Sequence, residues 1–433
     1  MDDLGIPPEQ VLAELRALRE NDADWRGGRT FSLVYHAGDE LAALARDAYA
    51  TYFAENALSP LAFPSLRRLE SEVLRMSAAL FHGATAAGSL TSGGSESILM
   101  AVKTARDHGR AVRGISAPEM VLPATAHPAF LKAAHYFGVA LRIVPVDAGF
   151  RADVRAAREL LSEATVLVVG SAPGYPHGVV DPIAELAALA HERGALFHTD
   201  ACLGGFLLPF ARELGAPVPD FDFRVPGVTS LSADLHKYGF AAKGASVVLY
   251  RDRELRRHQF FTASEWPGGL YGSPTMTGTR PGGAIAAAWA VLRHLGRRGY
   301  LELARGILDT SRRLREGIAS IPGLRILGEP VASVFAFASD SLDVYALGDA
   351  MDARGWHLDR QQLPPALHLM VTPAHAPVAE RFLADLAECA SGLARGEPAP
   401  PGSAAMYGMI GAVPERGQVG NFILEFMDEL YPS

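Results

Sequence analysis

Short runs of apolar residues alternate with helix-patterned segments through the middle of the chain. Six of these runs predict β-strands: Met120–Ala124, Leu141–Val146, Val166–Ser171, Ala195–Asp200, Val228–Ala233 and Ser246–Tyr250. Between them, residues 128–138, 152–164 and 182–194 carry apolar side chains at helical spacing, and two of these segments end in glycine, a favoured helix stop. Strands that alternate with helices are typical of a mostly parallel sheet covered by helices. We therefore expect an α/β domain.

The pattern differs on either side of this region. Before it, Leu66–Leu80 and Glu96–Arg106 are predicted to be amphipathic helices, the second directly after a turn rich in glycine and serine. After it, Ala284–Leu295 continues as helix, and from about Gly299 long helices mix with short strands such as Val334–Ala338. We therefore expect an N-terminal segment, a large domain and a small C-terminal domain, at residues 1–62, 63–298 and 299–433.

The composition excludes several classes of protein. With 433 residues, 49% hydrophobic and 20% charged, the chain can form two or three packed units and is not of the disordered type. Its net charge is −8 and its basic residues are scattered, so it has no electrostatic footprint for nucleic acid. Cys202 and Cys389 lie far apart without metal-ligand spacing, and we expect two reduced thiols and no metal site.

Neither export nor membrane insertion is expected. The chain begins MDDLGIPP, which is acidic and has no apolar core of signal-peptide length. The longest apolar stretch, around Ala284–Leu292, is about half of the roughly 20 residues that a membrane span needs. These features predict a cytoplasmic protein without an integral membrane segment.

A histidine and a lysine follow one of the predicted strands. Residues 230–244, SLSADLHKYGFAAKG, close the strand with a polar turn that contains His236 and Lys237. Open α/β sheets bind ligands at the carboxyl ends of their strands, and desolvation there lowers the pKa of a lysine. The neutral amine can then condense with an aldehyde. Taken alone, Lys237 could equally be a solvated surface residue.

Two other strand ends carry groups that suit pyridoxal phosphate (PLP). Asp200 ends a strand in LFHTDACLGGF, where its carboxylate can pair with the protonated pyridine nitrogen of PLP or can cap the following turn. His127, in PATAHPAF, can stack its ring on the cofactor or can be a satisfied, partly buried histidine. For Asp200 and for His127 taken alone, the sequence does not decide between the two roles.

A glycine-rich turn precedes one predicted helix, in TSGGSESILMAVKTARD at residues 91–107. Free N–H groups and the helix dipole bind anions at such a helix start, and glycine lets the backbone approach a phosphate. Ser95 and Glu96 could instead form a capping pair. Together with Lys237, Asp200 and His127, the turn indicates a PLP site within one domain.

These motifs, with YGSPTMTGTRPGG at residues 271–283 and AMYGM at 405–409, resemble those of sphingosine-1-phosphate lyases, a branch of the PLP-dependent decarboxylase group. Their order and spacing match from about Tyr35 to the C-terminus. The resemblance implies the PLP-dependent transferase fold of type I, with a mostly parallel seven-stranded sheet and a smaller α+β domain. It also implies a homodimer with shared active sites, in which residues 1–62 contribute to the dimer and the site and residues 63–298 bind PLP. Such enzymes cleave a phosphorylated long-chain base into a fatty aldehyde and phosphoethanolamine.

The resemblance also assigns roles around the cofactor. Lys237 would form the Schiff base, Asp200 would pair with the pyridine nitrogen, and His127 would stack on the ring. Four residues would hold the cofactor phosphate, the last of them supplied by the neighbouring subunit: Gly94, Ser95, His236 and Thr279.

Five positions are expected to serve the substrate. Tyr35 and Lys243 match positions that face the substrate or its phosphate, and Tyr271 would do so from the neighbouring subunit. Lys243 or a neighbouring tyrosine is a candidate for the transfer of the substrate's hydroxyl proton. Asn56 and Ser59 lie in Asn-Ala-Leu-Ser-Pro, where relatives carry a histidine at the position of Ser59. A neutral hydrogen bond replaces a charged one that is about twice as strong, so we expect weaker or differently built phosphate recognition.

Two alternatives remain open at the level of sequence. An amino-acid decarboxylase on the same fold would carry a group that recognises or expels a carboxylate, whereas a lyase needs phosphate donors such as Tyr35 and Lys243. A non-catalytic scaffold would not require Lys237, Asp200 and His127 together. The N-terminal membrane anchor of eukaryotic relatives is expected to be absent.

Overall fold

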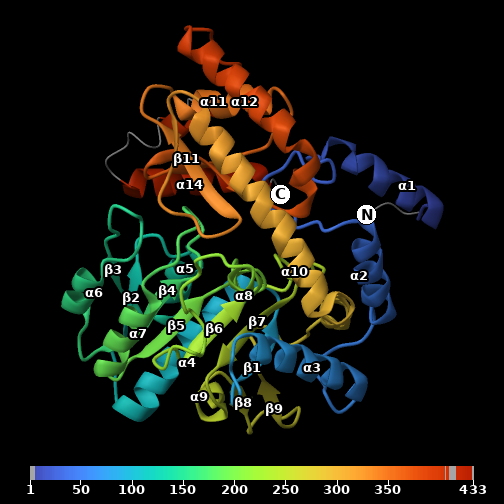
Figure 1. Ribbon diagram of the computed structural model, residues 1–433. Helices are drawn as coiled ribbons and strands as arrows, with labels where there is room; N and C mark the ends of the chain where they lie inside the picture. Colours follow the sequence, from blue (N-terminus) through green and yellow to red (C-terminus); the bar gives the residue numbers. More distant parts are fainter. Residues whose placement is uncertain (1–4, 405, 409–415, 432–433) are drawn as a thin grey trace.

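A seven-stranded sheet forms the centre of the larger part of the molecule (Figure 1). The computed structural model describes residues 5–404, 406–408 and 416–431. The strands of this sheet are β1 (Ala87–Thr91), β2 (Glu119–Pro123), β3 (Ala140–Val144), β4 (Thr165–Ser171), β5 (Leu196–Asp200), β6 (Ser230–Ala233) and β7 (Ser246–Tyr250). They lie in the order β1-β7-β6-β5-β4-β2-β3. Only β7 runs antiparallel to its neighbours, so the mostly parallel seven-stranded sheet is confirmed.

All six strands predicted for this sheet are present, with ends that differ by at most two residues. The prediction missed β1, which pairs with β7 at the edge of the sheet. Its sequence, AGSLT, is short and contains glycine and serine, which have little preference for strands. The sequence analysis predicted only the glycine- and serine-rich turn that follows this strand and the helix after that turn. That helix also starts earlier and ends later than predicted, at Gly94 and Arg113.

Helices cover both faces of the sheet. They are α3 (Pro64–Leu80), α4 (Gly94–Arg113), α5 (Ala129–Phe137), α6 (Val154–Leu160), α7 (Ile183–Glu192), α8 (Leu208–Glu213) and α9 (Arg253–Arg257). Met120 and Leu122 of β2 belong to a core cluster with α4 and α5, whereas Val121 belongs to the cluster that includes α6 and α7. Successive strand residues point to opposite faces, so β2 is buried on both sides.

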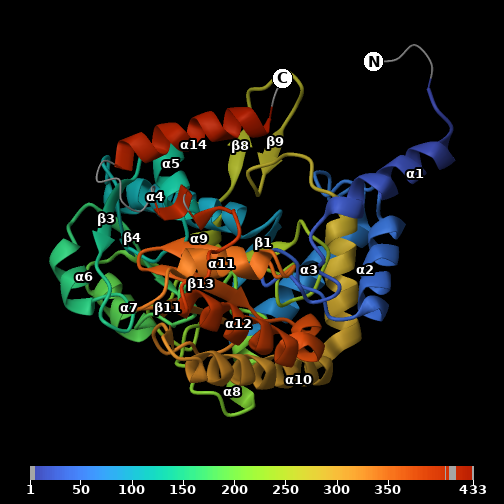
Figure 2. The same ribbon diagram turned by 90° about the horizontal axis from the view of Figure 1, so that it is seen from above.

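One long helix, α10 (Gly282–Ser320), runs past both parts of the molecule (Figure 1). It bends at Gly296, whose φ of 52° and ψ of −171° are not helical. Beside α2 (Asp39–Thr51), it packs on the large core, and Figure 2 shows the two helices next to each other. Ile307 still belongs to the large core, whereas Leu314 belongs to the smaller one. The boundary proposed at residues 298 and 299 therefore lies inside a helix that both cores share.

The smaller part is built on a four-stranded antiparallel sheet in the order β10-β11-β13-β12. Its elements are β10 (Leu324–Ile326), β11 (Val334–Ser339), α11 (Val344–Asp352), β12 (Asp359–Gln362), β13 (Pro365–Met370), η2 (Pro373–Val378) and α12 (Ala379–Ala394). The predicted α+β character is confirmed. Phe31, from the N-terminal segment, is fully buried in this core and stacks on His375 at 4.2 Å between ring centroids. The start of the chain thus completes the small core.

The remaining elements lie outside these two sheets. They are α1 (Pro8–Leu18), η1 (Arg19–Asn21), the hairpin of β8 (Phe261–Ala263) with β9 (Tyr271–Ser273), and α14 (Arg416–Leu430). In the late motif AMYGM, Ala405 and Met409 lie outside the described residues. None of the helices in the described ranges is both long and apolar enough to cross a membrane. Cys202 and Cys389 are buried, unpaired thiols.

Candidate active site

Two adjoining cavities lie beside Lys237, at the carboxyl ends of the parallel strands. The Tyr35 cavity has a volume of about 250 Å³, and the Gly94 cavity has one of about 320 Å³. Both are lined by four residues that follow or end strands β2, β5 and β6: His127, Asp200, Cys202 and Lys237. The topology therefore brings Lys237, Asp200 and His127 together as the sequence predicted, at the sheet edge where α/β folds bind ligands.

Lys237 is held by a carboxylate that the sequence analysis missed. Its Nζ lies 2.8 Å from Oδ2 of Asp234, whose side chain is 1% exposed. Burial lowers the pKa of Lys237, but the attraction of Asp234 outweighs it, and the pKa is raised. The expectation that desolvation lowers this pKa was therefore wrong, because a buried carboxylate three residues earlier stabilises the ammonium. The sequence signal was available, since Asp234 belongs to the same polar turn.

Asp200 is positioned by a chain of buried polar groups. Its Oδ1 accepts a hydrogen bond from the N–H of Cys202 at 3.0 Å and one from the hydroxyl of Ser232 at 3.4 Å. Ser232 in turn lies 3.1 Å from Nε2 of His198, whose pKa burial lowers to about 4, so the imidazole is neutral. The capping role that we considered for Asp200 is thus real, but these contacts engage only one carboxylate oxygen.

The start of α4 is an open anion site. No side chain caps this helix, and Glu96 does not pair with Ser95 but accepts hydrogen bonds from the N–H groups of Ser92 at 2.6 Å and Met276 at 2.9 Å. The capping alternative is therefore wrong. A Cβ placed on Gly94 would lie 2.8 Å from both Asp234 and Cys202, so only glycine fits here. The first N–H groups of α4 are left for a ligand.

Histidines flank the two cavities with defined ring orientations. His236 lines the Gly94 cavity, and its Nδ1 accepts a hydrogen bond from the N–H of Ala245 at 3.2 Å. Nδ1 of His127 accepts from the N–H of Ala129 at 3.1 Å. In the neutral ring the proton of each histidine therefore lies on Nε2. His236 Nε2 is 3.6 Å from Asp234, which adds a second partner to that buried carboxylate.

Tyr35 and Lys243 share a cavity with Lys237. Tyr35 donates a hydrogen bond to the sulfur of Met370 at 3.0 Å and packs edge-on against Tyr238. Lys243 Nζ donates to the carbonyl of Leu33 at 2.6 Å and lies 5.3 Å from the ring centroid of Tyr35. Burial, together with the repulsion of Lys237, lowers the pKa of Lys243. A cation and a phenol thus stand at one end of the Tyr35 cavity.

Tyr175 and Asp359 also line the Tyr35 cavity, and the sequence analysis missed both. The hydroxyl of Tyr175 donates to Oδ2 of Asp359 at 2.8 Å. Tyr175 follows β4, so its place after a strand end was a usable signal. Asp359 comes from β12 of the small domain, and no local pattern connects it with the sheet edge of the large domain.

Four other predicted residues, Asn56, Ser59, Tyr271 and Thr279, do not line either cavity. Three of them gather elsewhere as one group. Asn56 Nδ2 donates to the hydroxyl of Thr279 at 3.2 Å, and a Cβ on the neighbouring Gly278 would lie 3.2 Å from the hydroxyl of Tyr271. Ser59 lies three residues after Asn56, and its side chain is exposed. We call Asn56, Ser59, Tyr271 and Thr279 the hairpin group.

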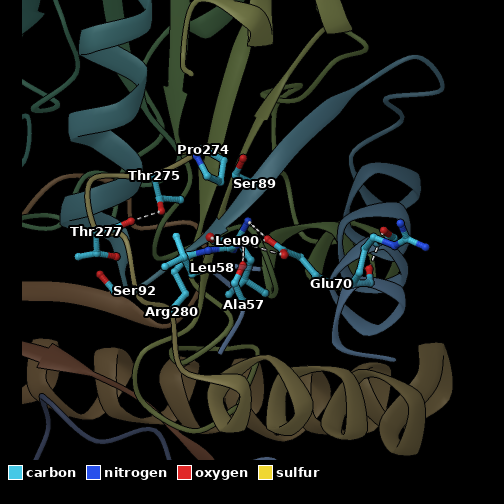
Figure 3. A network of polar contacts seen from close by, with 12 residues as sticks. Ala57, Leu58, Glu70, Ser89, Leu90, Ser92, Pro274, Thr275, Thr277 and Arg280 are labelled. Atoms are coloured by element: carbon cyan, nitrogen blue, oxygen red, sulfur yellow. Dashed lines mark hydrogen bonds and ion pairs between the residues drawn. The ribbon is translucent and has the colours of Figure 1, made fainter. Parts of the chain in front are cut away.

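Arg280 directly follows Thr279 and fastens the hairpin group to the rest of the chain. Figure 3 shows Arg280 with its partners Glu70, Ala57 and Leu90. Its guanidinium forms a bidentate ion pair with Glu70 of α3, with one Nη2 to Oε2 distance of 3.1 Å, and also donates to the carbonyls of Ala57 and Leu90. The side chains of Arg280 and Glu70 are only 11% and 16% exposed. The Arg280 N–H donates to Asn56 as well. The group is therefore held rigidly, although it does not line the cavities beside Lys237 of its own chain.

The residues around Lys237 fit PLP. An uncapped helix start with glycine at its first position suits a phosphate, and a lysine ammonium lies next to it. Asp200 is buried at the end of β5, where it can meet a protonated ring nitrogen. The fold and this donor set define a PLP-dependent enzyme. In agreement, the pyridoxal-dependent decarboxylase conserved domain matches residues 23–339.

Comparison with known proteins identifies the family within the PLP-dependent enzymes. The chain is 46% identical over 429 residues to the sphingosine-1-phosphate lyase of Oryza sativa subsp. japonica, covering 97% of this chain and 79% of that protein. Identity to sphingosine-1-phosphate lyase 1 of Rattus norvegicus is 43%, with 99% and 76% covered. The sphingosine-1-phosphate lyase structure from Burkholderia pseudomallei matches with a TM-score of 0.88 at 45% identity, covering 92% of this chain and 94% of that one. The chain belongs to the sphingosine-1-phosphate lyase family, as its motifs predicted.

The fold extends beyond this family. Glutamate decarboxylase from Lactobacillus brevis matches with a TM-score of 0.79 at 20% identity, covering 91% of this chain and 94% of that one. At this identity the likeness concerns the fold alone. Decarboxylases and lyases therefore share one framework, and side chains in the cavities decide between their reactions.

Proposed function

We propose that this chain is a PLP-dependent carbon–carbon lyase that cleaves a phosphorylated 2-amino-3-hydroxy long-chain base into a fatty aldehyde and phosphoethanolamine. The observation that carries the proposal is the composition of the Tyr35 cavity. It places Lys243 and Tyr35, donors suited to a phosphate, beside Lys237. The membership of the family supports the same reaction.

PLP, when bound, supplies a ring that takes up the electron pair of the bond being broken. Lys237 would attach the cofactor through Nζ. Asp200, held by Cys202 and Ser232, would pair with the ring nitrogen. Asp234 holds Nζ as an ammonium when the amine is free, and this proton would be available to the carbon that loses its bond.

Gly94, Ser95 and the Nε2–H of His236 would hold the cofactor phosphate at the start of α4, and His127 would contact the cofactor ring. Lys243 and Tyr35 would hold the substrate phosphate and so orient the bond between the amino carbon and the hydroxyl-bearing carbon for cleavage. The residues that line the two cavities support these roles.

The hairpin group completes the active site of a second copy of the chain, so that the functional unit is a homodimer. Two observations support this part of the proposal. The group is rigid yet absent from the cavities of its own chain. Large apolar side chains around it are exposed, as is typical of an interface: Leu58, Leu61, Trp266, Leu270 and Met276. In the dimer, Thr279 reaches the partner's cofactor phosphate, and Tyr271, Asn56 and Ser59 its substrate.

The reaction is tested with a panel of phosphorylated and unphosphorylated amino alcohols and amino acids, with aldehyde and carbon dioxide measured together. We expect aldehyde from phosphorylated 2-amino-3-hydroxy compounds, and no aldehyde from the Lys237→Ala variant. Carbon dioxide from amino acids, without aldehyde from sphingoid phosphates, would overturn the proposal in favour of a decarboxylase.

The attachment of the cofactor is tested separately. Borohydride reduction of the PLP-loaded protein followed by peptide mass spectrometry should add a pyridoxyl mass to Lys237. A parent enzyme that carries this mass yet turns over no amine would instead support a non-catalytic scaffold.

A further inference from the structure

A hydrogen-bonded pair from two domains forms one wall of the Tyr35 cavity. Tyr175 comes from the loop after β4 in the large domain, and Asp359 comes from β12 in the small domain. Tyr175 Oη donates to Asp359 Oδ2 at 2.8 Å, and both side chains are only partly buried. Lys237, Lys243 and Tyr35 line the same cavity. The pair therefore faces the space in which the substrate is cleaved.

The small domain fixes the loop that carries Tyr175. His368 Nε2, on β13, donates to the carbonyl of Tyr175 at 2.8 Å, and its ring is fully buried. The side-chain amide of Gln361 donates to the carbonyl of Pro176 at 2.7 Å. Both contacts come from the strand pair that also holds Asp359. The phenol and the carboxylate are thus presented to the cavity in one fixed arrangement.

Cleavage between the amino carbon and the hydroxyl-bearing carbon requires an acceptor for the hydroxyl proton. Lys243 Nζ already donates to the carbonyl of Leu33 at 2.6 Å, and in the proposed function it binds the phosphate. Tyr175 alone is a poor acceptor, because burial and the negative charge of Asp359 raise the pKa of its phenol. If Tyr175 lost its proton, its phenolate would lie next to the negative carboxylate of Asp359. Tyr175 can take up a proton only if its own proton leaves at the same time.

We propose that Asp359 is the terminal proton acceptor of the cleavage step and that it acts through Tyr175. The inference rests on the proposed function, because it concerns the hydroxyl of that substrate. The hydroxyl O–H bond breaks and its proton passes to Tyr175 Oη, while the proton of Tyr175 passes to Asp359 Oδ2. The freed electron pair on oxygen forms the aldehyde C=O bond. The carbon–carbon bond breaks, and its electron pair goes to the amino carbon, which takes a proton from Lys237.

The Asp359→Asn variant separates this role from a structural one. Asparagine keeps a carbonyl oxygen that can accept the hydrogen bond of Tyr175, but it cannot take the proton. We expect kcat for aldehyde release to fall about 100-fold with little change in KM, the size typical of a lost proton acceptor. Tyr175→Phe should lower kcat similarly, and the double variant should lose little more, because both residues serve one transfer. If Asp359 had only a structural role, kcat of the Asp359→Asn variant should be nearly normal.

A partial reaction provides a readout that does not involve the hydroxyl. Phosphoethanolamine, the proposed product, has no hydroxyl at the cleaved position, and its exchange of a carbon-bound hydrogen with D2O needs only the cofactor and Lys237. NMR should show parental exchange in Asp359→Asn, together with parental absorbance of the bound cofactor. The matched control is Asp340→Asn, which removes an exposed carboxylate paired with Arg325 on the same domain and should change neither reaction.

The outcomes are distinct. Loss of cleavage with normal exchange supports the relay through Asp359. Normal cleavage in Asp359→Asn overturns it and leaves the proposed function intact. Loss of both reactions also overturns it, because Asp359 would then support the site as a whole. A parent enzyme that releases no aldehyde refutes the proposed function itself.

Discussion

The arrangement of the hairpin group makes a quantitative prediction about mixed dimers. Lys237→Ala removes the cofactor-bearing amine of one chain, whereas Thr279→Glu places a negative charge where the partner's cofactor phosphate is expected. Thr279 is exposed in the chain, so the substitution should leave the fold intact. Each variant alone should be inactive, since every site in its homodimer has one defect.

A heterodimer of these two variants contains one intact site. The site on the Lys237→Ala chain receives Glu at position 279 from its partner, so it carries both defects. The site on the Thr279→Glu chain keeps its own Lys237 and receives the normal Thr279 from its partner, so it is intact. Co-expression with two different tags and sequential purification isolates this heterodimer. Its aldehyde release should be about half that of the parental dimer, because one of two symmetric sites works. Two homodimers without any intact site cannot produce this activity.

The matched control pairs two substitutions from the same cavity, Lys237→Ala with Asp200→Ala. Both residues line the cavities of their own chain, so each site of this heterodimer keeps one defect and no activity should return. The assignment of Thr279 to the partner's site would be refuted by either of two results. One is equal recovery of activity in the test and control heterodimers. The other is no activity in a test heterodimer whose composition native mass spectrometry has verified.

Three further predictions concern single residues. Arg280→Met should lower the free energy of unfolding by about 3 kcal/mol in urea titrations, since it leaves the partly buried Glu70 unpaired, whereas the exposed Arg298→Met should change it by less than about 0.5 kcal/mol. The pKa of Asp234 is lower in the folded chain, despite its burial, chiefly because of Lys237. Its ion pair therefore stabilises the fold above the unfolded-state pKa and is lost as the pH falls below it, so Asp234→Asn should lower Tm near neutral pH and flatten the decline of Tm below pH ~4. Ser59→His should lower KM for a phosphorylated base about threefold to tenfold in steady-state assays, while the KM for the unphosphorylated base stays the same.

Local sequence patterns were sufficient for six of the seven strands of the large sheet. The inner parallel strands β2, β4 and β5 are apolar runs that are largely buried, and polar residues at or after their ends lie at the ligand-binding edge. Asp200, Lys237 and His127 were therefore predictable as a set, although none of them was decisive alone. β1 was missed because AGSLT carries little strand preference and is stabilised by its pairing with β7.

Features that depend on distant parts of the chain could not be predicted. The raised pKa of Lys237 follows from the burial of Asp234, which the fold imposes and the sequence does not reveal. Asp359 reaches the cavity only because the small domain packs against the loop after β4. Phe31 joins the small core across almost the whole length of the chain. For Asp359 and Phe31 the deciding contacts are long-range, whereas Asp234 is only three residues from Lys237 and it is the burial of its carboxylate that the fold supplies.

The two cavities differ in where their walls originate. The Gly94 cavity is lined only by residues between Ser92 and Lys237, whereas the Tyr35 cavity also needs Leu33 and, from beyond α10, Asp359 and Met370. During synthesis, a chain that has emerged only as far as β7 already carries every residue of the first cavity. The part of the cofactor site that one chain supplies is thus complete before the walls of the substrate chamber have been synthesised.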